Sequence, residues 1–144
     1  MNVIVMGCGR VGASVAGQLS EGGHDVSVID TDPFAFSRLP TNFAGRRITG
    51  SGNDFRILEA INIEEADVFI AVASGDNRNL LASQRAKHQF GIKNVITRVK
   101  DPQRSVLFEQ LGLSTFSPTK NGSELIITSL FEETPDKLTE ASQG

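Results

Sequence analysis

The segment Asn2-Val3-Ile4-Val5-Met6-Gly7-Cys8-Gly9-Arg10-Val11-Gly12 decides the fold of this 144-residue chain. Its first half is a short apolar run typical of a buried strand, and its second half matches the pattern G-x-G-x-x-G. Apolar side chains then recur at helical spacing from Val11 to Leu19. The segment therefore predicts a strand, a tight glycine turn and a helix whose first turn faces a phosphate group.

The three glycines of this turn have separate roles in such a motif. Gly7 permits the tight turn, Gly9 lets a pyrophosphate approach the backbone, and Gly12 lets the helix pack closely on the sheet. Asp30 ends the next β-branched strand, about 20 residues after Gly9, as the dinucleotide-binding pattern requires. Its carboxylate can accept hydrogen bonds from ribose hydroxyl groups and would repel a 2′-phosphate, so NAD is favoured over NADP.

Strand and helix patterns alternate along the rest of the chain. The predicted strands cover about residues 2–6, 25–30, 47–49, 68–72, 94–99 and 114–116, and the last helix covers about 122–131. This alternation predicts an α/β fold of the Rossmann type, a doubly wound parallel sheet of about six strands in the order 3-2-1-4-5-6 with helices on both faces. We expect the domain to cover residues 1–133 and the polar segment 134–144 to be a disordered tail.

Cap and spacing rules predict local details of two helices. Asp32 is expected to cap a short helix that has Pro33 at its first position. Asp76 or Asn77 is expected to cap the helix after the fourth strand. Spacing predicts that the buried stripe of that helix consists of Leu80, Leu81, Ala82, Ala86 and Phe90.

The composition argues against several classes of function. The formal net charge of -3, without a basic stripe, makes nucleic acid an unexpected partner. The single cysteine, Cys8, cannot form an internal disulfide, and no leader pattern precedes the first strand, so we expect a cytoplasmic protein. The apolar run 68–73 is far shorter than the roughly 20 residues of a membrane span, so any membrane role should go through a partner.

Further candidate residues follow from the topology of an open parallel sheet. Its ligands bind beyond the carboxyl ends of the strands, so the turns after the third and fourth strands should also line the site. We expect the backbone of Gly52, Ala73 and Ser74 to contact an adenine, whereas Asn53 could equally serve in a helix cap. Arg98 closes the fifth strand at the same edge and could contact phosphates, contact a neighbouring subunit or form a surface ion pair.

Two residues of the glycine turn leave alternatives open. Arg10 would be unfavourable in the first turn of a helix unless an anion is bound nearby, so phosphate contact and a solvated side chain are both possible. Cys8 is expected to fill a small space, without redox chemistry, because the chain has no resolving cysteine. The complete predicted nucleotide-binding set is Gly7, Cys8, Gly9, Arg10, Val11, Gly12, Asp30, Thr31, Gly52, Asn53, Ala73, Ser74 and Arg98.

Catalytic and metal-binding patterns are missing from the sequence. His24 and His88 have no second ligand at metal spacing, and no Ser-His-Asp or paired-carboxylate pattern is evident. The chain has no tyrosine for the Tyr/Lys pair of many dehydrogenases. We therefore expect no catalytic residue, no metal site and no enzyme activity. A small NAD-dependent oxidoreductase and an assembly subunit without a ligand are the alternatives.

An ordered set of motifs extends beyond the glycine turn. It consists of Gly7 to Asp30, Gly50 to Asp54, Ala66-Asp67-Val68, Ala73-Ser74-Gly75-Asp76-Asn77, Asn79-Leu80-Leu81, Ile96-Thr97-Arg98-Val99, Pro102, Leu107-Phe108-Glu109-Gln110-Leu111-Gly112 and Ser117-Pro118. The set, which covers about residues 1–131, resembles the regulator of potassium conductance family. More narrowly, it resembles the N-terminal subdomain of TrkA- and KtrA-type potassium-uptake regulators.

The resemblance implies a cytoplasmic regulatory subunit or domain at the inner face of the membrane. Such a protein binds NAD or NADH, or alternatively ATP, ADP or AMP, and docks on a membrane potassium transporter or channel subunit as a dimer or a ring of dimers. Relatives often carry Ser/His-Pro-Glu at an intersubunit cation site, but Thr119 follows Pro118 here, so no such metal is expected. Many relatives also have a C-terminal subdomain, so this chain is either part of a longer protein or a one-subdomain member.

The last predicted helix carries more apolar surface than a terminal helix needs. Leu125, Ile126, Leu130 and Phe131 lie within one short segment. Such a surface predicts dimerisation, and packing of the helix on its own sheet is the alternative.

Overall fold

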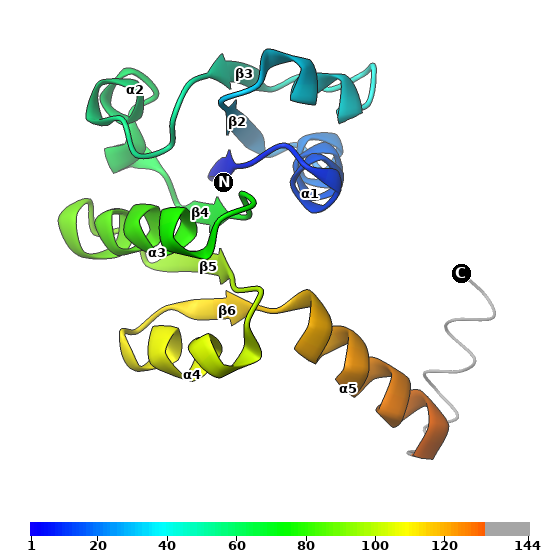
Figure 1. Ribbon diagram of the computed structural model, residues 1–144. Coiled ribbons are helices and arrows are strands. Elements are labelled where there is room, and N and C mark those ends of the chain that lie inside the picture. The colour runs from blue at the N-terminus through cyan, green and yellow to red at the C-terminus, as the bar shows by residue number, and fades with distance from the viewer. Residues whose placement is uncertain (132–144) are drawn as a thin grey trace.

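The computed structural model describes residues 1–131. A sheet of six strands forms the centre of the fold. The strands are β1 (Asn2–Met6), β2 (Asp25–Asp30), β3 (Arg46–Thr49), β4 (Val68–Ala71), β5 (Asn94–Arg98) and β6 (Ser114–Phe116). Their order is β3-β2-β1-β4-β5-β6 and every pair is parallel, which confirms the predicted fold (Figure 1). The predicted tail over 134–144 and the predicted domain end at 133 lie outside the described residues.

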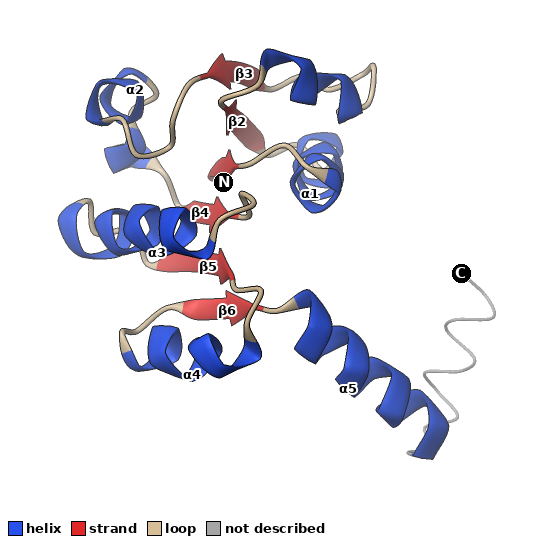
Figure 2. Cartoon of the chain, viewed as in Figure 1, coloured by secondary structure: helices blue, strands red, loops and turns tan. Residues whose placement is uncertain are grey.

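Helices cover both faces of the sheet, as predicted (Figure 2). On one face, Ala13, Ala16 and Ala35 pack against valine side chains of β1 and β2. On the other face, Leu58, Ala82 and Phe108 belong to a second core cluster. The helical elements are α1 (Arg10–Glu21), the 3₁₀ helix η1 (Pro33–Arg38), α2 (Phe55–Ala60), the 3₁₀ turn η2 (Ile63–Glu65), α3 (Asp76–Gln84), the π-helix η3 (Arg85–Gln89), α4 (Pro102–Gln110) and α5 (Pro118–Phe131).

Burial of the strands explains why their sequences are so apolar. All four residues of β4 are buried, since this strand lies between β1 and β5 and is covered on both faces. The strand order reverses between β1 and β4, which lie side by side although β4 is the fourth strand in the chain. The carboxyl ends of β1 and β4 therefore form the topological switch point, where open α/β sheets bind their ligands.

The prediction for Asp32 is confirmed, but the prediction that Asp76 or Asn77 caps α3 is wrong. Asp32 accepts a hydrogen bond of 2.9 Å from the N–H of Phe34 and caps η1. Asp76, by contrast, does not cap α3: the N-cap position is Gly75, and the Asp76 carboxylate accepts the N–H of Lys100 at 2.9 Å. The first residue of α3 thus holds the segment that follows β5.

The buried stripe of α3 agrees with the predicted one except at Leu81: Ala82 and Ala86 are buried, and Leu80 and Phe90 pack against the core. Leu81 is 46% exposed, whereas Asn79, Ala82, Ser83 and Ala86 are buried. The spacing of these four residues is helical, so the face is regular, but half of it is polar. Counting only apolar side chains misses the polar half of the face, because Asn79 and Ser83 have hydrogen-bond partners beneath the helix.

Helix α5 leads away from the sheet at the β6 edge (Figure 1). It begins at Pro118, earlier than predicted, since proline is well suited to the first position of a helix. None of its residues is buried, and Leu125, Ile126, Ile127, Leu130 and Phe131 are all more than half exposed. Packing of this helix on its own sheet is therefore excluded. Within residues 1–131, no helix combines the length and apolarity needed to cross a bilayer.

Candidate nucleotide-binding site

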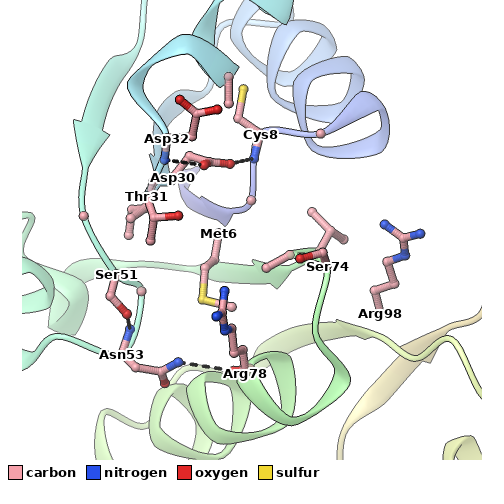
Figure 3. Close-up of a pocket in the computed structure, with 18 of the residues that line it drawn as sticks. Met6, Cys8, Asp30, Thr31, Asp32, Ser51, Asn53, Ser74, Arg78 and Arg98 are labelled. Atoms are coloured by element: carbon pink, nitrogen blue, oxygen red, sulfur yellow. Dashed lines mark hydrogen bonds between the residues drawn. The ribbon is translucent and has the colours of Figure 1, made fainter.

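A cavity of about 650 Å³ lies at the carboxyl edge of the sheet (Figure 3). The turns after β1, β2, β3 and β4 line it together with the last residue of β5, and its volume is within the usual range of small-molecule sites. Most of the predicted nucleotide-binding residues meet here: Gly7, Cys8, Gly9, Asp30, Thr31, Gly52, Asn53, Ala73, Ser74 and Arg98. The tertiary structure thus brings together residues from five separate strand ends.

Three residues of the predicted set lie outside this cavity. Gly12 faces the turn itself, since a Cβ atom at Gly12 would lie 1.9 Å from the carbonyl oxygen of Gly7. Val11 packs against the core on the α1 side of the sheet. Arg10 is exposed and lines a separate groove of about 580 Å³ along α1. Arg38 lines both this groove and the cavity.

The glycine turn is shaped for the close approach of a ligand. Gly7 has a φ of 106°, and a Cβ atom there would lie 2.7 Å from the backbone nitrogen of Ala73. Gly9 borders the cavity, and a Cβ atom at Gly9 would meet no other atom within 4 Å. The turn is therefore closed on its protein side and open on the side where α1 begins, which is the geometry of a phosphate-binding turn.

Asp30 joins the glycine turn to the end of β2. Its Oδ2 atom accepts the backbone N–H of Cys8 at 2.8 Å, and its Oδ1 atom accepts the N–H of Asp32 at 2.9 Å. Each carboxylate oxygen has two lone pairs, so both remain able to accept one ribose hydroxyl. The two backbone bonds fix the carboxylate in place before any ligand arrives.

The thiol of Cys8 is buried in the core, although its backbone lines the cavity. Burial raises the pKa of the Cys8 thiol, and the negative charge of Asp30 raises this pKa further. The thiol is therefore kept protonated and fills space, as predicted for a residue without redox chemistry.

Two arginines in the cavity escaped the sequence analysis. Arg38 reaches it from the last residue of η1, where its Nη1 atom lies 3.5 Å from the carbonyl oxygen of Cys8. Arg78 reaches it from the first turn of α3 (Figure 3). The position of Arg78 was a usable signal, because a cation in the first turn of a helix opposes the helix dipole unless an anion is bound.

The arginines of the cavity leave their charges available to a ligand. Within the described part of the chain, the one ion pair is between Arg56 and Asp54, outside the cavity. Arg38, Arg78 and Arg98 therefore form no ion pair with Asp30 or Asp32 in residues 1–131. The Nε atom of Arg98 is buried without a hydrogen-bond partner there. Such an atom is costly to leave unpaired, so a ligand that accepts a hydrogen bond from it would be favoured.

Hydrogen bonds join the β3 side of the cavity to α3. The Asn53 side chain donates to the carbonyl oxygen of Arg78 at 3.4 Å, and Arg85 donates to the carbonyl oxygen of Asn53 at 2.8 Å. Gly52 packs directly on Met6, since a Cβ atom there would lie 2.2 Å from the Met6 sulfur. Ser51 also lines the cavity, as expected for the turn after β3. Residues that line the cavity but were not predicted are Met6, Ile29, Asp32, Ala35, Arg38, Gly50, Val72 and Arg78.

A parallel sheet in this strand order, with a glycine turn and an acid at its carboxyl edge, defines a Rossmann-type nucleotide-binding domain. The model of the TrkA-N domain family matches residues 3–117, so the chain belongs to the TrkA-N domain family, as the resemblance of its motifs indicated. Among the residues described, no three His, Cys, Asp or Glu side chains are placed to hold a metal ion.

Relatives of known name and structure agree with this family. The Trk system potassium uptake protein TrkA of Streptomyces coelicolor is 46% identical over 120 residues, which are 83% of this chain and 54% of that protein. The chain thus spans about half the length of the curated relatives it matches.

Solved structures show the same fold at low identity. The Kef CTD of Shewanella denitrificans in an AMP-bound form has a TM-score of 0.73 and 20% identity, over 99% of this chain and 89% of that one. GsuK bound to ADP has a TM-score of 0.74 and 17% identity, over 92% of this chain and 34% of that one.

Proposed function

We propose that this chain is the nucleotide-sensing domain of a regulatory protein for a potassium uptake system or channel. The observation that carries the proposal is the shared cavity of the glycine turn, Asp30 and three arginines that form no ion pair within residues 1–131. The name of the Streptomyces relative, a potassium uptake protein, supports the transport system. Regulation of a partner would place the domain in the cytoplasm, at the inner face of the membrane.

The proposed ligand is NAD or NADH, or alternatively ATP, ADP or AMP. Asp30 suits a ribose with free 2′- and 3′-hydroxyl groups, and its charge disfavours a 2′-phosphate. The glycine turn and the arginines suit phosphate groups. Two solved structures with this fold, one in an AMP-bound form and one bound to ADP, support the same ligand class.

Self-association through α5 is part of the proposal. The apolar side chains of α5 are exposed from Leu125 to Phe131, and a second copy of the same helix would offer a matching apolar surface. The cavity and α5 are connected through the sheet: Arg98 pairs with Phe116 in the β5–β6 ladder, and Val99 donates to the carbonyl oxygen of Phe116 at 2.8 Å. Helix α5 begins two residues later at Pro118.

A ligand regulates only if it binds two arrangements of the assembly with different affinities. We therefore expect NADH and ADP, which place different groups beyond the same adenosine, to favour different arrangements of the α5 helices. Catalysis is not part of the proposal.

Binding experiments test the proposed function directly. Mass spectrometry should identify an adenine nucleotide retained by the purified chain, and calorimetry should show saturable binding of at least one of NAD, NADH, ATP, ADP or AMP. Failure of all five to bind at millimolar concentration would favour an assembly subunit without a ligand. Sustained NADH oxidation with a small carbonyl substrate, abolished in Asp30→Ala, would instead identify an oxidoreductase.

The transport role needs a separate experiment with the full-length protein. In cells that lack the gene, the native protein should restore growth at low potassium, and the same protein with Asp30→Ala should not. Equal growth with both would show that nucleotide binding does not control uptake.

A further inference from the structure

Asn79 is a fully buried polar residue in the first turn of α3, with an exposed fraction of 0%. Its side-chain oxygen accepts the N–H of Ala73 at 3.0 Å, and its side-chain nitrogen donates to the carbonyl oxygens of Ala73 at 2.9 Å and Arg98 at 3.2 Å. One amide therefore binds the backbone of two residues that line the cavity.

The position of these bonds matters because the β4–β5 ladder ends just before them. The last paired residues of the ladder are Ala71 and Thr97. Beyond this pair, the Asn79 amide takes over from the backbone and links Ala73, after β4, to Arg98, the last residue of β5. The Asn79 amide is therefore the side chain that links the backbone of Ala73 to the backbone of Arg98 beyond the end of the ladder.

Arg98 is the charged residue of the cavity that the Asn79 amide holds. Its Nε atom is buried without a partner in the described residues, and Figure 3 shows its side chain on the Ser74 side of the cavity. The direction of this side chain depends on where the Arg98 backbone is held, and Asn79 holds its carbonyl oxygen. Asp76 adds a second, exposed link from the same helix to Lys100.

We propose that Asn79 is a positioning residue for the nucleotide, which holds the Ala73 backbone and the Arg98 guanidinium at the spacing that one phosphorylated ligand requires. The inference rests on the proposed nucleotide-binding function. Asn79 itself does not line the cavity and acts only through its two backbone partners.

The chain offers a matched control for this proposal. Ser83 lies on the same helix, one turn further on, and accepts a buried hydrogen bond of 2.7 Å from Thr97 of the same strand. Neither Ser83 nor Thr97 lines the cavity. Loss of this bond disturbs the contact of α3 with β5 but leaves all three hydrogen bonds of the Asn79 amide in place.

The experiment compares ADP affinity, by calorimetry, and thermal unfolding for the 144-residue chain and its variants. Asn79→Ala should lower the affinity about tenfold or more, as expected when the displaced Arg98 guanidinium loses its hydrogen bond to a phosphate. Ser83→Ala should lower the unfolding temperature but leave the affinity within about twofold. If Asn79→Ala does not fold, Asn79→Ser takes its place, because a hydroxyl can be hydrated in the space left by the amide.

A double-mutant cycle separates positioning from general stability. If Asn79 acts through Arg98, removing Asn79 should matter little once Arg98 is gone. The double variant Asn79→Ala with Arg98→Ala should therefore lose much less ADP affinity than the two single fold-losses multiplied together. Strict additivity, or equal affinity losses in Asn79→Ala and Ser83→Ala, would overturn the inference. Absence of ADP binding by the unaltered chain would overturn the proposed site for ADP as well, and this result is measured before any variant is made.

Discussion

The backbone N–H of Cys8 donates a hydrogen bond of 2.8 Å to the Oδ2 atom of Asp30. This bond makes the glycine turn and the acid at the end of β2 one unit, although they belong to different strands. Because the carboxylate is held by backbone N–H groups on both oxygens, its orientation toward a ribose is set before binding.

Replacement of this carboxylate should weaken nucleotide binding. We expect Asp30→Ala to reduce affinity for ADP or NADH about tenfold or more, because both the ribose acceptor and the clamp on the turn are lost. Calorimetry measures the change. The control is Asp67→Ala, since Asp67 accepts the N–H of Asn2 at 2.7 Å at the other end of the sheet. Unchanged affinity in Asp30→Ala would remove this residue from the site.

The second and third glycines of the turn, Gly9 and Gly12, should separate binding from folding. A Cβ atom at Gly12 would meet the carbonyl oxygen of Gly7 at 1.9 Å, so Gly12→Ala should destabilise the fold by about 1–3 kcal/mol, as overpacking does. A Cβ atom at Gly9 meets nothing within 4 Å, so Gly9→Ala should keep its unfolding temperature but lose nucleotide affinity. Thermal unfolding and calorimetry on both variants check this; equal stability losses would contradict it.

Arg78 should contribute more to binding of a charged ligand than of an uncharged one. We expect Arg78→Ala to weaken ADP binding several-fold and adenosine binding less, and the loss should shrink at high salt. Arg56→Ala is the control, because Arg56 is exposed and pairs with Asp54 outside the cavity. Equal losses of affinity for ADP and adenosine would show that Arg78 contacts the adenosine part of the ligand and not its phosphates.

Helix α5 should control self-association without affecting the nucleotide. Light scattering should show that the chain forms dimers or larger assemblies at high concentration, and that Ile126→Glu with Leu130→Glu is monomeric, because two buried charges would oppose apolar contact. Ser123→Glu, on the same helix, should still associate. A monomeric native chain at high concentration would contradict the prediction.

The spacing of local sequence signals was sufficient to predict the strands, the strand order and the residues of the glycine turn. Gly7, Gly9 and Asp30 were recognisable because a tight turn, a close ligand approach and a strand-end acid each demand a particular residue at a particular spacing. Most of the predicted site residues do meet in one cavity. That they bind a nucleotide stays a prediction.

The remaining features depend on contacts between segments that are distant in the sequence. Arg38 and Arg78 enter the cavity from two helices on opposite faces of the sheet, and no local pattern brings them together. Asn79 interrupts an apolar stripe, and it lies in the core only because the ends of β4 and β5 offer it backbone partners. The conformation of a tight turn depends on the residues within it, so it can be predicted from sequence. The hydrogen-bond partners of a buried polar side chain come close to it only when the chain has folded.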